Sequence, residues 1–206
     1  MSKGERLICT VCRNQLPLTE YTYNVENPFD SIFYGRVSVK KSNSFLFFTD
    51  NGIVKNLIHH LKYKNQEHIG DFLGDWCGSI LREKGNIPKI DLVIPVPLHK
   101  KKLKKRGYNQ VSLFAQKIAT HLNSTYLEDV LIKTKNTKTQ TKKDRFFRWQ
   151  SNQDLFQLNP KHTIANKNIL LVDDVVTTGA TLESCVKAFD AEEGISIYIL
   201  TMAIVL

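Results

Sequence analysis

The sequence predicts an α/β protein built on a mainly parallel, doubly wound sheet with helices on both faces. From Asp91 onward, apolar runs of strand length alternate with segments whose apolar residues recur at the helical period. Asp91–Val96 and Asn168–Val176 are rich in consecutive apolar residues, as expected for strands covered on both faces. The chain has 206 residues, 42% of them hydrophobic, which is enough for one packed domain and a small appendage.

The first part of the chain divides into a polar segment and a mixed segment. Residues 1–35 are polar and turn-rich, so we predict a weakly structured N-terminal appendage ahead of a main domain over residues 36–206. Arg36–Phe48 has two apolar runs around the polar sequence KKSN, which predicts a β-hairpin. A helix is expected to open at Gly52, and a second one to cover Glu67–Lys84, each with one apolar face.

The rest of the chain alternates between strands and helices. We predict strands over residues 91–96, 127–132, 155–158, 168–176 and 195–205, and helices over residues 109–122 and 181–189. In open sheets of this kind a ligand lies at the carboxyl ends of the strands. The residues that follow the strands are therefore the first candidates for a functional site.

The net charge of +9 is concentrated in two segments. His99–Arg106 and Lys133–Arg148 together hold 13 of the 29 basic residues, and the rest of the chain is slightly acidic. This distribution favours a local site for a polyanion over a generally basic surface. No apolar run approaches the ~20 residues of a membrane span, and the polar start does not resemble a secretory signal. We therefore expect a cytoplasmic protein without a membrane span.

The strongest motif is Ile169–Thr181, ILLVDDVVTTGAT. An apolar strand leads to two carboxylates, Asp173 and Asp174, which we expect at the strand end, where both can turn toward a ligand. Small residues and hydroxyls follow, and the next helix begins there. Glycine tolerates unusual dihedral angles, and the free N–H groups of a helix start bind anions. The segment therefore predicts carboxylates for sugar hydroxyls beside a cradle for phosphate.

This segment resembles the motif with which type I phosphoribosyltransferases bind phosphoribosyl pyrophosphate (PRPP), and every position of that motif is filled. The resemblance implies the type I phosphoribosyltransferase fold, with a small hood that sets the acceptor, here Phe33–Lys64. It implies that Asp173 and Asp174 bind the ribose 2- and 3-hydroxyls. It also implies that the 5-phosphate is held by Thr177, Thr178, Gly179, Ala180 and Thr181.

Three further segments resemble the ComF family of competence proteins, which are often described as amidophosphoribosyltransferase-like. They are Leu61–Gln66, Val93–Gln110 and Arg145–Phe156, and the resemblance extends from about Phe33 to the C-terminus. ComF-type proteins commonly begin with a four-cysteine zinc module, whereas this chain has only the pair Cys9 and Cys12 there. A structural zinc site needs four ligands, so the pair is either part of a truncated module or vestigial, and we expect no zinc.

The basic run after Pro97 corresponds in such a fold to the loop that contacts pyrophosphate. Its candidate residues are Pro97, Leu98, His99, Lys100 and Arg106. Lysine and arginine there can stabilise the charge of the leaving group. The alternatives are a solvated charge run, which fits Lys101 and Lys104 best, or a basic patch for nucleic acid.

Lys133–Gln153 is too long for an ordinary connection and corresponds to the flexible loop that closes over a phosphoribosyltransferase site. Arg145 and Arg148 are the candidates to reach pyrophosphate from it. Phe146, Phe147 and Trp149 are interleaved with them, which equally suits stacking on the bases of single-stranded nucleic acid.

Two functions therefore remain open. The first is a phosphoribosyltransferase, a pentosyl-transferring glycosyltransferase, that uses PRPP with Mg²⁺ and transfers 5-phosphoribosyl to an unidentified acceptor with loss of pyrophosphate. Mg²⁺ would arrive with PRPP and not through a metal site of the chain's own, because Mg²⁺ keeps several waters and few protein ligands. The second is a non-enzymatic component of competence and DNA uptake, which binds single-stranded DNA through its basic segments and keeps the PRPP site as a sensor or relic.

Overall fold

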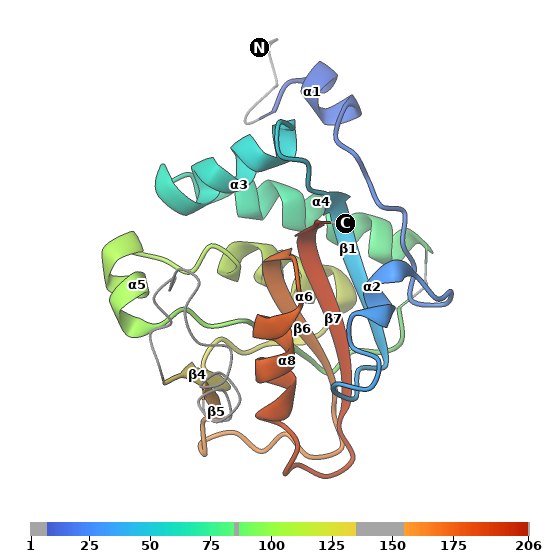
Figure 1. The fold of residues 1–206 in the computed structure, drawn as a ribbon, viewed down its shortest axis with the longest axis vertical. Helices are drawn as coiled ribbons and strands as arrows, with labels where there is room; N and C mark the ends of the chain where they lie inside the picture. The colour runs from blue at the N-terminus through green and yellow to red at the C-terminus, as the bar shows by residue number, and fades with distance from the viewer. Residues whose placement is uncertain (1–7, 85–86, 135–154, 206) are drawn as a thin grey trace.

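The computed structural model describes residues 8–84, 87–134 and 155–205, and its centre is a five-stranded parallel sheet (Figure 1). The strand order is β1-β7-β6-β2-β3, and every pairing in this sheet is parallel. The strands are β1 (Lys41–Phe47), β7 (Ser196–Ile204), β6 (Asn168–Val176), β2 (Leu92–Pro95) and β3 (Thr125–Tyr126). The predicted α/β architecture with a mainly parallel sheet is confirmed.

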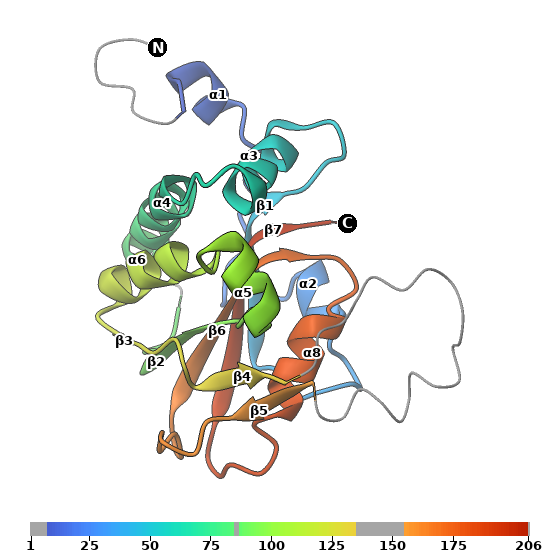
Figure 2. The ribbon, with the colours of Figure 1, turned by 90° about the vertical axis from the view of Figure 1, so that its left-hand side faces the viewer.

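Helices cover both faces of this sheet. One face carries α3 (Ile53–Tyr63), α4 (His68–Lys84) and α6 (Ser112–Leu122), and the other carries α2 (Pro28–Ser31) and α8 (Ala180–Lys187). There are also two short helices, α1 (Thr10–Asn14) and α5 (Lys100–Arg106). A separate antiparallel ribbon joins β4 (Leu131–Lys133) to β5 (Phe156–Leu158) and lies beside α8 (Figure 2).

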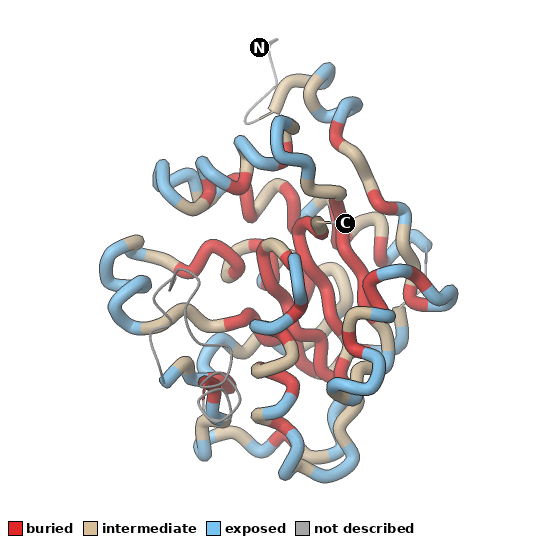
Figure 3. Tube along the Cα trace, viewed as in Figure 1, coloured by how far each residue is buried: buried red, intermediate tan, exposed pale blue. Residues whose placement is uncertain are grey.

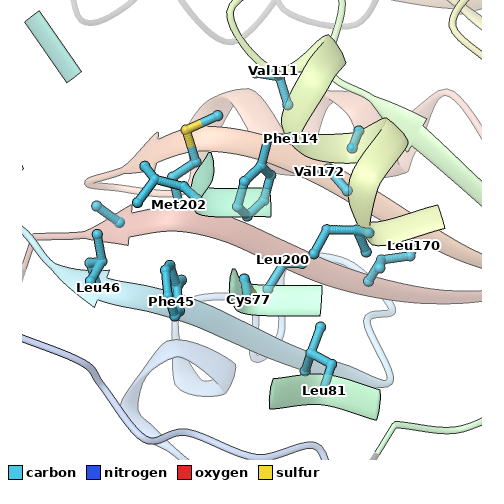
Figure 4. Packing of buried hydrophobic residues seen from close by; sticks show 14 of the residues in the cluster. Phe45, Leu46, Cys77, Leu81, Val111, Phe114, Leu170, Val172, Leu200 and Met202 are labelled. Atoms are coloured by element: carbon cyan, nitrogen blue, oxygen red, sulfur yellow. The ribbon is translucent and has the colours of Figure 1, made fainter. Parts of the chain in front are cut away.

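The core consists of two apolar clusters, one on each face of the sheet. Burial is concentrated in the central strands, while α5 lies at the surface (Figure 3). In the cluster that α4 and α6 cover, the Phe114 ring lies between Met202 and Val172, and Cys77 belongs to the same cluster (Figure 4). Alternate residues of β6 serve the two clusters, since Leu170 belongs to one and Leu171 to the other. This alternation fixes which face each later residue of the strand approaches.

The predicted hairpin over Arg36–Phe48 is wrong. Residues 36–39 form no strand, and β1 pairs in parallel with β7, with Ser44 opposite Thr201. The polar sequence inside β1 is buried because the N-terminal segment supplies hydrogen bonds to it. The side-chain amide of Asn43 donates to the carbonyl of Tyr21 at 2.9 Å, and the N–H of Ser42 donates to Asp30 Oδ1 at 2.7 Å.

The N-terminal segment is predicted to be weakly structured, but its described part is held against the sheet by backbone hydrogen bonds. Leu18 bridges antiparallel to Leu46, and the N–H of Phe47 donates to the carbonyl of Pro17 at 2.8 Å, so this segment covers the outer edge of β1. Phe29 is fully buried in the core beside Phe33. The division of the chain at residue 35 stays a prediction.

Two local predictions also need correction. The expected strand over residues 127–132 is replaced by β3 and β4, which lie in different sheets. The basic run after His99 is the helix α5 and not a loop, because the His99 side chain caps its start and Gly107, with φ +87°, ends it. No helix among the described residues is long and apolar enough to cross a membrane.

Candidate functional site

Asp173 and Asp174 lie inside β6 and not at its end, because the pairing with β7 continues to Val176. Both residues are largely buried, with 8% and 6% of their surfaces exposed. They nevertheless lie near the carboxyl edge of the sheet, and the loop Thr177–Gly179 and helix α8 follow directly. Because β6 continues past them, the two carboxylates lie in the interior just before the loop.

Asp174 is held by a network that comes from α3 and from the start of α6. Its Oδ2 accepts a hydrogen bond from Gln110 Nε2 at 2.5 Å and forms an ion pair with Lys62 Nζ at 2.9 Å. Arg106 donates in turn to the side-chain oxygen of Gln110. Its guanidinium also lies 5.5 Å from the centre of the Tyr63 ring. One cation, Lys62, thus contacts the carboxylate directly, and a second, Arg106, is linked to it through Gln110.

Asp173 has different surroundings. Its Oδ1 accepts the N–H of Asp174 at 2.8 Å. Burial, and then the neighbouring charge of Asp174, raise the pKa of Asp173 from 3.8 to about 7. The charge of Lys133 acts on Asp173 in the opposite direction, and burial lowers the pKa of Lys133 itself. A carboxyl group with this pKa changes its charge near neutral pH, which is typical of functional sites.

The loop after β6 forms a small hollow of about 60 Å³, lined by Asp173 and residues 175–182. Gly179 has φ +73°, a conformation that favours glycine, and it stands at the N-cap of α8. Among the described residues, no hydrogen-bond acceptor is found for the backbone N–H groups of Thr177, Thr178 and Gly179. The loop can therefore offer its N–H groups, together with the positive end of α8, to an anion.

The N-terminal segment supports this loop from behind. Arg36 Nη1 donates to the carbonyl of Thr178 at 3.1 Å and to that of Ile32 at 3.0 Å, and its Nη2 pairs with Glu183. A Cβ on Gly179 would stand 2.5 Å from the side chain of Ile32. Arg36 and Ile32 thus hold the loop in the conformation that exposes its N–H groups.

The candidate pyrophosphate residues are only partly brought to the site. Arg106 reaches it through Gln110, whereas Lys100 belongs to the exposed surface of α5. His99 Nδ1 accepts the N–H of Lys101 at 3.2 Å. Pro97 and Leu98 form the irregular link from β2 to α5. Arg145 and Arg148 lie outside the described residues.

Sequence reasoning missed Lys62, Gln110 and Arg36 as site residues. Lys62 and Gln110 belong to segments that resemble ComF-type proteins, but neither residue type signals a role without its neighbours in space. A second hollow of about 210 Å³, mostly apolar, lies between the N-terminal segment, β1 and α4 and is lined by none of the predicted site residues. Within the described ranges, no group of three or more His, Cys, Asp or Glu residues could hold a metal ion.

Comparison with known proteins identifies the domain that contains this site. A family model described as phosphoribosyl transferase domain matches residues 111–203, which include both aspartates and the loop. Competence protein F of Haemophilus influenzae is 32% identical over 135 residues, covering 64% of this chain and 59% of the relative. Competence protein ComFC of Bacillus subtilis is 30% identical over 136 residues, covering 66% and 52%. DNA utilization protein YhgH of Escherichia coli strain K12 is 28% identical over 129 residues, covering 61% and 56%.

These matches span between about half and three fifths of the length of the curated relatives. Two solved structures also show similarity, each with a TM-score of 0.41. They are a hypoxanthine phosphoribosyltransferase from Staphylococcus aureus, 15% identical and covering 66% of this chain and 63% of that one, and an adenine phosphoribosyltransferase from Saccharomyces cerevisiae, 16% identical and covering 68% and 72%. The family match and the parallel sheet confirm the type I phosphoribosyltransferase fold. Residues 111–203 therefore match a phosphoribosyl transferase domain, and the chain, as predicted, is similar to the ComF-type competence proteins.

Proposed function

We propose that the protein binds PRPP together with Mg²⁺ and transfers its 5-phosphoribosyl group to an acceptor, with release of pyrophosphate. The observation that carries this proposal is the loop Thr177–Thr181, which lines a small hollow together with Asp173 and in which the N–H groups of residues 177–179 have no acceptor among the described residues. A phosphate in the hollow would accept hydrogen bonds from the loop and gain from the positive end of α8. The loop resembles the 5-phosphate site of phosphoribosyltransferases and lies within the matched domain.

The two aspartates support the ribose part of the proposal. Buried carboxylates accept strong hydrogen bonds from hydroxyl groups, and two adjacent ones can bind a vicinal diol. Asp173 lies on the loop side, and Asp174 lies toward α3 and α6. Lys62 and Arg106 are the cations on the Asp174 side of a ribose bound in this way.

Mg²⁺ fits this arrangement as a ligand of PRPP. The described residues hold no cluster of three or more ligating side chains, but Mg²⁺ usually keeps several waters and needs only one or two carboxylates. When bound, Mg²⁺ would neutralise charge on the diphosphate leaving group. Asp173 and Asp174 are the residues that would hold it, directly or through water. The chain's own contribution is to position the ribose and to place cations beside the diphosphate.

The experiment is isothermal titration calorimetry of the full chain with PRPP, with and without Mg²⁺. We expect Mg²⁺-dependent binding that the double variant D173N/D174N loses and that the exposed-site variant D190N keeps. Exchange of labelled pyrophosphate into PRPP in the presence of candidate acceptors then tests the transfer step. Binding without exchange would favour a sensor over an enzyme, and no binding by the wild-type chain would overturn the proposal.

A second function has support of its own. The lysines of α5 at positions 100, 101, 102, 104 and 105 are all exposed, and they form a basic surface next to the site. The names of the similar proteins refer to competence and to DNA utilization. Single-stranded DNA is therefore the alternative ligand. Its binding would weaken steeply with salt and would need the lysines but neither aspartate nor Mg²⁺.

A further inference from the structure

Lys62 is fixed at the site by the packing of α3. Leu61 is fully buried in the core, and the Tyr108 hydroxyl donates a hydrogen bond to its carbonyl. The next residue therefore extends toward Asp174, and the Lys62 side chain remains 22% exposed. The position of Lys62 is therefore set by the packing of its neighbour Leu61 in the core.

The hydrogen bonds of Asp174 leave little room for another donor. Oδ2 accepts a hydrogen bond from Gln110 and is also occupied by the Lys62 ammonium, which pairs with it at 2.9 Å, and Oδ1 accepts the N–H of Val175 at 2.6 Å. An ionised carboxylate offers about four acceptor positions, two on each oxygen. These contacts occupy both positions on Oδ2, so a ribose hydroxyl that hydrogen-bonds to Oδ2 must displace Lys62 or Gln110.

Of the donors on Oδ2, Lys62 is the one that can move. Gln110 is buried and is held on its other side by Arg106. The Lys62 ammonium ends a flexible four-carbon stem, and part of it already reaches solvent. A lysine that leaves its ion pair with a carboxylate needs another anion nearby to offset the lost interaction energy. The diphosphate on C1 of PRPP is attached one carbon away from the 2-hydroxyl that would replace it.

We propose that Lys62 is a diphosphate-binding residue, which moves from Asp174 to the diphosphate of PRPP as the ribose 2-hydroxyl takes its place on the carboxylate. This inference rests on the proposed function and adds a residue to that same site. It assigns the hood helix α3 a direct contact with the leaving group. It also makes a prediction that differs for two ligands, because ribose 5-phosphate has the hydroxyls and the 5-phosphate but no diphosphate.

The test measures both ligands by calorimetry with the full chain in the presence of Mg²⁺. The variant K62Q is neutral but can still donate a hydrogen bond to Asp174, K62R keeps the charge, and K55Q is the matched control on the same helix. Lys55 is half exposed and pairs only loosely, at 3.8 Å, with the exposed Asp50. Thermal unfolding of each variant establishes that the fold is kept.

We expect K62Q to weaken PRPP binding about tenfold or more, the loss of one charge-assisted contact, while its affinity for ribose 5-phosphate stays within about twofold or improves. K62R should restore most of the PRPP affinity, and K55Q should change neither ligand. Equal weakening of both ligands by K62Q would make Lys62 a structural residue, and no weakening of PRPP would exclude the contact. Either result overturns the inference, whereas a wild-type chain that binds neither ligand would overturn the proposed function itself.

Discussion

Replacing Asp173 with Asn should remove a large pH effect on the free energy of unfolding. The pKa of Asp173 is about 7 in the folded protein, against an ordinary value of 3.8, because the carboxyl group is buried beside Asp174. Between these values the folded protein binds more protons than the unfolded chain, so the free energy of unfolding falls as the pH rises. The contribution of Asp173 is fully present below about pH 4 and is lost as the pH rises through 7.

The size of the effect follows from the same two values. At about 1.4 kcal/mol per pH unit, the interval from pH 3.8 to pH 7 corresponds to about 4 kcal/mol. The variant D173N keeps an oxygen that can accept the N–H of Asp174 but has no charge at any pH. The variant should therefore match the wild-type chain near pH 4 and exceed its free energy of unfolding by about 4 kcal/mol near pH 7.5.

Urea denaturation followed by circular dichroism, at half-unit steps from pH 4.5 to pH 7.5, measures this difference. D190N is the matched control, because Asp190 is exposed, and its difference from wild type should not change with pH. A D173N advantage that stays constant across the range, or that shrinks as the pH rises, would refute the reasoning. An advantage that grows would show that the protein keeps a destabilising carboxylate, as expected for a group that serves a ligand.

Three further outcomes are expected. The affinity for PRPP with Mg²⁺ should rise as the pH increases from 6 to 8, because ionisation of Asp173 favours a cation-bearing ligand, and the rise should be smaller in D173N when calorimetry is repeated at each pH. G179A should destabilise the chain by about 1–3 kcal/mol in urea denaturation and abolish PRPP binding, because φ is +73° and the added Cβ meets Ile32 at 2.5 Å. F29A should lower the free energy of unfolding by about 3–5 kcal/mol, because Phe29 is fully buried, whereas V25A at an exposed position should change it little. An unchanged F29A would contradict the packing of the N-terminal segment against the sheet.

The sequence alone determined the elements whose signals are local. The run from Asn168 to Val176 is a strand with the predicted bounds, and the helices after Gly52 and Gly179 begin where their apolar faces begin. The order of carboxylates, hydroxyls and glycine at the end of a buried strand also predicted the candidate site, because these residues are close together in the chain and stay close in the folded protein. Those features depend on neighbours in the chain, which a sequence displays directly.

The tertiary structure decided which residues meet from distant segments. The polar sequence of β1 predicted a hairpin turn, but hydrogen bonds from the N-terminal segment make it a buried strand beside β7. Asp174 was expected to lie open at a strand end, but Lys62 and Gln110 contact it from α3 and the start of α6. Such pairings depend on how the helices pack across the sheet, and the free energy that fixes them comes from the shared core and not from the local sequence.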